Sequence, residues 1–159
     1  MTVAKSFAIW LMILLSAGYP RHGFSGYWGV DTLENDSAIG FLDEIVHANE
    51  VNGVVGALDA VLNGDQYIDD EKAARALAAA ELVAAMIGRP SKTMAKDKIE
   101  WAMEQRLRAS DMVPLAIRAI DKITQRSETR DLLMESTDSK MLREWEKNVR
   151  RLRSRLANK

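Results

Sequence analysis

The sequence of 159 residues contains no cysteine, only three prolines and only two histidines, His22 and His47. Without cysteine the chain has no disulfide, no thiolate nucleophile and no cysteine-type zinc site. The Gly-x-x-x-x-Gly-Lys, His-Glu-x-x-His and Gly-x-Ser-x-Gly signatures of common enzyme classes are also missing. We therefore expect no catalytic residue, no cofactor and no metal site, although the sequence does not exclude an enzyme.

Net charge is also nearly absent, at −1 for the whole chain, so nothing in it favours nucleic acid or an anionic membrane as a partner. The charges are nevertheless unevenly distributed. Residues 31–100 contain 14 acidic and 6 basic residues, whereas residues 101–159 contain 9 acidic and 14 basic residues. Such a dipolar chain either docks its halves together or offers a partner two faces.

The first thirty residues contain no acidic residue, and Lys5 precedes an apolar run at residues 7–15. This layout resembles a secretory signal peptide, with cleavage after Gly18 or Ser25 and export to the periplasm or medium. The run is too short for a stable membrane span. A buried first helix and a start codon placed too early are the alternatives, and in both the protein is cytoplasmic. We expect a signal-like or extension segment at 1–25, with residues 1–18 dispensable for folding, and one domain at 26–159.

Helical spacing of apolar residues begins after a Gly-rich linker at residues 19–32, whose Trp28 we expect to anchor the linker on the core. Asn35 or Asp36 caps the first predicted helix, with Ile39, Leu42, Ile45 and Val46 on its inner face. Further helices are predicted at 51–62, from 69–71 to Gly88, and at 99–107, 110–123, 128–134 and 139–157. No segment alternates as a strand does. The prediction is an all-α, single compact domain of about six helices, packed orthogonally or as a bundle.

Several motifs resemble one bacterial family of small helical proteins, domain-of-unknown-function family 4259. They are Gly26-Tyr27-Trp28-Gly29, Glu34-Asn35-Asp36-Ser37-Ala38, Phe41-Leu42-Asp43, Ala78-Ala79-Ala80-Glu81, Ile87-Gly88-Arg89-Pro90, Trp101 and Trp145. The resemblance covers about residues 26–156. The chain departs from the family in its N-terminal extension and in Leu133, where another tryptophan is frequent. The resemblance implies a helical fold and carries no activity with it.

Two groups of polar residues are candidate sites. Asp36, Gly40, Asp43 and His47 share one stripe of the first predicted helix, as metal ligands do, but the apolar residues lie opposite, which favours a solvated face. Glu81 instead falls among alanines on the apolar arc of its helix. We expect Glu81 to be at least three-quarters buried and hydrogen-bonded by an arginine, an indole or backbone donors, because an unpaired buried charge is costly. A cleft acid of raised pKa is the functional alternative.

The last predicted helix carries Arg150, Arg151, Arg153 and Arg155 near its end. No aromatic residue interleaves with them, so a solvated face or a partner surface is favoured over nucleic acid. Two functional hypotheses follow. The first is a non-enzymatic interaction protein, such as an immunity or accessory factor with one protein partner. The second is a small enzyme or ligand-binding protein with Glu81 in its pocket.

Overall fold

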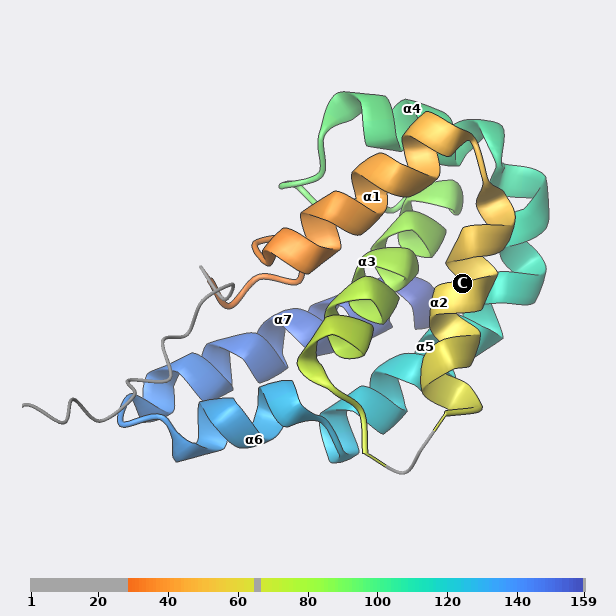
Figure 1. Ribbon diagram of the computed structural model, residues 1–159. Helices are drawn as coiled ribbons and strands as arrows, with labels where there is room; N and C mark the ends of the chain where they lie inside the picture. The colour runs from red at the N-terminus through yellow and green to blue at the C-terminus, as the bar shows by residue number, and fades with distance from the viewer. Residues whose placement is uncertain (1–28, 65–66, 159) are drawn as a thin grey trace, which may run out of the picture.

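The computed structural model describes residues 29–64 and 67–158, most of which lie in helices (Figure 1). This part of the chain contains seven α-helices and one short 3₁₀ helix. They are α1 (Asp36–Ala48), α2 (Val51–Leu62), α3 (Asp70–Met86), α4 (Lys96–Glu104), η1 (Arg106–Arg108), α5 (Ala109–Gln125), α6 (Glu128–Glu135) and α7 (Ser139–Ala157). In the same residues the only β pairing is an isolated bridge between Ile68 and Ser127. The predicted all-α class is confirmed, with one helix more than the estimate of about six.

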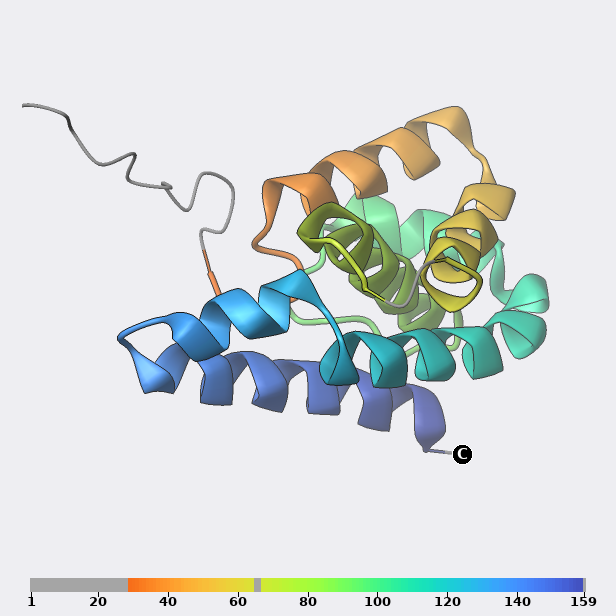
Figure 2. The ribbon, with the colours of Figure 1, turned by 60° about the horizontal axis from the view of Figure 1, so that its bottom comes forward.

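The alanine-rich helix α3 is the centre of the domain. Between Ala73 and Met86 every residue except Arg75 is buried, and α3 contacts all six other α-helices. Alanine side chains permit this because they let neighbouring helix axes approach closely. Figure 2 shows α3 between α1 and α2 on one side and α5 and α7 on the other. Glu81, in the C-terminal half of α3, is therefore enclosed by neighbouring helices.

The start of α1 and both ends of α3 follow signals in the sequence. Asn35 caps α1 by accepting from the backbone N–H of Ser37 at 2.8 Å. Asp69 caps α3 by accepting from the N–H of Lys72 at 2.8 Å. After α3 the chain turns at Gly88, whose φ of +79° is the left-handed conformation that glycine adopts without strain. Of the two caps proposed for α1, Asn35 is right and Asp36 is not.

Two details of the predicted helices are wrong. Ile39 is 45% exposed, because the inner face of α1 is centred on Ala38, Phe41 and Ile45. The helix predicted at 99–107 begins earlier, at Lys96, and gives way to η1, where Leu107 is 88% exposed. Both Ile39 and Leu107 are therefore apolar residues that face solvent.

Two predictions concern residues that the structure does not describe. The signal-like segment at 1–25 and the packing of Trp28 both lie outside the described residues, and both stay predictions. Among residues 29–64 and 67–158, no helix combines the length and the apolar character that crossing a membrane requires.

Candidate functional site

Glu81 lies in the C-terminal half of α3 and is 1% exposed, the one acidic side chain in the buried core of the described residues. The prediction that it is buried and hydrogen-bonded is confirmed. Its Oε1 accepts from the hydroxyl of Thr32 at 2.7 Å and from Nη2 of Arg155 at 2.6 Å. Its Oε2 accepts from the same Nη2 at 2.8 Å. Both carboxylate oxygens are thus occupied by partners from the N-terminal linker and from α7.

Burial and the arginine act on the Glu81 carboxyl in opposite directions. Removal from water raises the pKa of Glu81, and the charge and hydrogen bonds of Arg155 offset part of that rise. The pKa remains above the ordinary value of a glutamate. The environment of Glu81 therefore tolerates the neutral acid well, as expected for a side chain enclosed by alanines.

Arg155 also belongs to a reciprocal clamp at the end of α7. Its Nη1 donates to the carbonyl of Arg89 at 3.0 Å, and Nη1 of Arg89 donates to the carbonyl of Arg155 at 2.8 Å and to that of Asn158. The Arg89 guanidinium thus caps the last carbonyls of α7, where a cation is favoured. The clamp fixes the end of α7 against the loop that follows α3.

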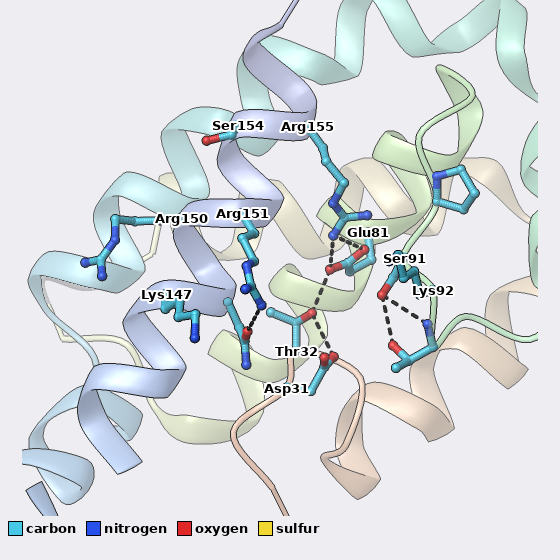
Figure 3. A pocket seen from close by; sticks show the side chains of 13 residues that line it. Asp31, Thr32, Glu81, Ser91, Lys92, Lys147, Arg150, Arg151, Ser154 and Arg155 are labelled. Atoms are coloured by element: carbon cyan, nitrogen blue, oxygen red, sulfur yellow. Dashed lines mark hydrogen bonds and ion pairs between the residues drawn. The ribbon is translucent and has the colours of Figure 1, made fainter. Parts of the chain in front are cut away.

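An open cleft of about 840 Å³ lies above the Glu81 network (Figure 3). Helix α7 forms one wall with Lys147 and Arg151, and the loop at residues 90–93 forms the other. Thr32 and Glu81 lie at the floor between them. We call this cavity, with its walls and floor, the basic cleft.

The lining of the basic cleft carries more positive than negative charge. Its ionisable residues are Asp31, Glu81, Lys92, Lys147, Arg150, Arg151 and Arg155. Arg155 is committed to Glu81, while Lys147 and Arg150 form exposed ion pairs with Glu144 and Glu146 on their own helix. Exposed pairs of this kind are worth at most about 1 kcal/mol each. Both cations therefore remain available to a ligand.

Lys92 and Arg151 are the least compensated cations of the basic cleft. Among the residues that the structure describes, neither forms an ion pair, and both are exposed. Nη1 of Arg151 donates to Oδ1 of Asn148 at 3.3 Å, and Nδ2 of Asn148 donates to the carbonyl of Val30 at 3.1 Å. Arg151 is thus oriented by a neighbour that is itself held by the linker.

Comparison with known proteins identifies the family. A family model described as Domain of unknown function (DUF4259) matches residues 26–148. The chain belongs to this family. No curated protein and no solved structure matches it. The resemblance drawn from the sequence motifs is confirmed, and the match in DUF4259 includes Glu81, Lys92 and Lys147 but ends before Arg151 and Arg155.

The polar stripe predicted on the first helix of this DUF4259 chain does not join Glu81. Asp36 and Asp43 are exposed on the outer face of α1, as the solvated-face interpretation predicts, and so is His47. Asp43 pairs with Nζ of Lys98 on α4 at 2.8 Å. No group of three potential metal ligands occurs in the described part of the chain.

Sequence reasoning treated the arginines of α7 in this DUF4259 chain as one group, whereas the structure divides them. Arg155 reaches Glu81, Arg153 pairs with Asp121 on α5 at 2.7 Å, and Arg151 faces the basic cleft. A signal for this division exists in the sequence, because Lys147, Arg151 and Arg155 recur every four residues and share one face of the helix. Lys92 has no comparable signal, since only the folded chain brings its loop opposite α7.

Proposed function

We propose that this protein is a non-enzymatic interaction factor that binds a protein partner through its basic cleft. The observation that carries the proposal is the presence of two exposed cations without ion pairs, Lys92 and Arg151, on opposite walls of one cavity. Unpaired charges on facing walls attract a ligand of opposite charge and orient it. Both walls are fixed, one by the clamp between Arg89 and Arg155 and the other by packing of α7 on the core.

The position of Glu81 supports binding rather than chemistry. A general acid, base or nucleophile must reach the reacting atoms of a substrate. Glu81 is almost fully buried, and its two oxygens already accept hydrogen bonds from Thr32 and Arg155. Its carboxylate joins the N-terminal linker to α7 at the floor of the basic cleft, which is a structural role. This favours the interaction hypothesis over an enzyme with Glu81 in its pocket.

The lining also supports a protein partner over nucleic acid. Single-stranded nucleic acids are bound by basic grooves in which bases stack on aromatic side chains. None of the described residues that line the basic cleft is aromatic. The lining mixes cations with the hydroxyl groups of Thr32, Ser91, Thr93 and Ser154. Such a surface suits the carboxylates and backbone of a protein segment.

Photo-crosslinking inside the source organism tests the proposal. We expect benzoylphenylalanine in place of Ser154, an exposed residue of the cleft lining that carries no charge, to yield a discrete adduct with one other protein. The same group at position 106, on η1 and away from the cleft, serves as the control. Arg151→Glu should abolish the adduct at position 154, and Arg106→Glu should leave it intact. Equal adducts from positions 154 and 106, or an adduct insensitive to Arg151→Glu, would contradict the proposal.

A further inference from the structure

We infer that the element received by the basic cleft is an acidic peptide segment of the partner, whose carboxylates meet Lys92 on one wall and Arg151 on the other. The inference rests on the proposed function and names the chemistry of the partner at that site. Lys92 belongs to the loop wall and Arg151 to α7, so each wall of the cleft carries a cation (Figure 3). The guanidinium of Arg151 keeps further N–H donors for a carboxylate, because the structure shows only Nη1 in a hydrogen bond.

The cations on α7 are spaced along a line rather than gathered at a point. Lys147, Arg151 and Arg155 follow one another at four-residue intervals, which in an α-helix correspond to about 6 Å each. Acidic side chains four residues apart on a helix, or two apart on a strand, have nearly the same spacing. Because Arg155 is already paired with Glu81, the cations left for a ligand are Lys147 and Arg151 on this face and Lys92 on the other wall. Such a spread of charge is matched by several carboxylates on one chain better than by a single compact anion.

The helix dipole does not account for this row. Cations are stabilised by the partial negative charge at a helix C-terminus, but the effect is confined to the last turn. In α7, which ends at Ala157, the last turn contains Arg155 alone among the basic residues. Arg151 lies more than one turn from that end and Lys147 more than two. Their charges therefore remain available to a ligand rather than compensating the end of the helix.

The surroundings of the cleft favour carboxylates over phosphate. Phosphate sites commonly use the N-terminus of a helix, where free backbone N–H groups converge on the ligand. None of the described residues that line the basic cleft belongs to the first turn of a helix, so no such set of free N–H groups faces the cavity. The cleft offers charged side chains and hydroxyl groups instead, which suit carboxylates distributed along a peptide.

Fluorescence anisotropy with the full chain tests the inference directly. The probes are a fluorescein-labelled 12-residue peptide rich in glutamate and the same peptide with every glutamate replaced by glutamine. We expect saturable binding of the acidic peptide only, with affinity falling as salt rises. The double variant Lys92→Glu/Arg151→Glu should weaken binding at least tenfold, and Lys92→Gln/Arg151→Gln should weaken it less. Thermal melts of both variants should match wild type, because both side chains are exposed.

The control for non-specific attraction is Arg106→Glu/Lys140→Glu, which makes the same change of charge outside the basic cleft. Its affinity for the acidic peptide should stay within twofold of wild type. The inference would be overturned if both glutamate double variants lost the same affinity for the acidic peptide, or if the glutamine peptide bound equally well. It would also be overturned if inorganic phosphate or a single-stranded oligonucleotide bound more tightly than the acidic peptide. An adduct from position 154 in cells that depends on Arg151, without binding of the acidic peptide, would overturn this inference alone. Absence of the adduct would overturn the proposed function itself.

Discussion

Replacement of Glu81 by glutamine and by leucine separates the hydrogen-bonding role of this side chain from its charge. Glutamine keeps an Oε1 that can accept from Thr32 and Arg155, and it loses the bond made by Oε2. Because burial raises the pKa of Glu81, its site tolerates a neutral group, and glutamine resembles the protonated acid. Leucine fills the space but leaves the Thr32 hydroxyl and the Arg155 guanidinium without their acceptor.

The expected magnitudes follow from these contacts. Glu81→Gln removes about one hydrogen bond, and we expect it to cost about 1 kcal/mol. Removing one partner of a fully buried ion pair costs about 3 to 5 kcal/mol. The Arg155 side chain is 25% exposed and can be reached by water from the cleft, so we expect a smaller cost of about 2 to 3 kcal/mol for Glu81→Leu. For a chain of this size each kcal/mol lowers Tm by about 2 to 4 °C.

The pH dependence of the same variants tests the direction of the pKa shift. The folded state holds the Glu81 proton at pH values where the unfolded chain, with a pKa near 4.5, has lost it. The contribution of Glu81 to stability is therefore greatest below about pH 4.5 and falls as pH rises through the folded pKa. Glutamine does not titrate, so the stability difference between wild type and Glu81→Gln should shrink with rising pH.

Urea melts of wild type, Glu81→Gln and Glu81→Leu at several pH values between 4 and 8 measure these free energies of unfolding and their pH dependence. Equal stability of the three proteins would refute the reasoning that the carboxylate organises the floor of the basic cleft. Greater loss in Glu81→Gln than in Glu81→Leu would refute the hydrogen-bond argument. A wild-type advantage that grows with pH would show that the ion pair with Arg155 outweighs burial.

Three further predictions each concern a single residue. Arg155→Met should destabilise the fold more at pH 7.5 than at pH 4.5 in urea melts, because loss of the arginine raises the pKa of Glu81 further and ionisation of Glu81 in the unfolded chain then favours unfolding; a loss independent of pH would contradict this. Gly88→Ala should lower the free energy of unfolding by about 1 to 2 kcal/mol in the same assay. The loss comes from the left-handed φ alone, since a Cβ at this position meets no atom within 4 Å. An unchanged free energy of unfolding would contradict this. Trp101→Phe should lower the free energy of unfolding by about 1 kcal/mol more in wild type than in an Asn49→Gly background. The reason is that Nε1 of Trp101 donates to Oδ1 of Asn49 at 2.8 Å, a bond that the background lacks. Equal losses in the two backgrounds would show that packing alone matters.

The helices could be predicted because their signals are local. Asn35 and Asp69 supply cap oxygens, Gly88 supplies a left-handed turn, and apolar spacing marks the segments between them. The same method misplaced Ile39, because it ranked faces by the size of apolar side chains and gave no weight to Ala38, which is fully buried. A small residue at a close helix contact contributes little to an apolar pattern, yet it shows where another helix approaches.

The candidate site could be predicted only in part. The burial of Glu81 follows from its angle on α3, which is local information. Its partners do not, because Thr32 and Arg155 are 49 and 74 residues away and reach it through tertiary packing. The basic cleft likewise depends on a loop residue, Lys92, lying opposite Arg151. Contacts of this kind require the order and angles of the helices, which neither periodicity nor charge counts provide.

The central claim is that a protein partner presents acidic residues to the basic cleft, and amide chemical shifts of the ¹⁵N-labelled chain test it most directly. Titration with the glutamate-rich peptide should shift the amides of Ser91, Lys92, Thr93, Asn148 and Arg151, which surround the cleft. Amides of η1 and of the outer face of α1 should stay in place. Shifts confined to those outer surfaces, or absent at saturating peptide, would contradict the account.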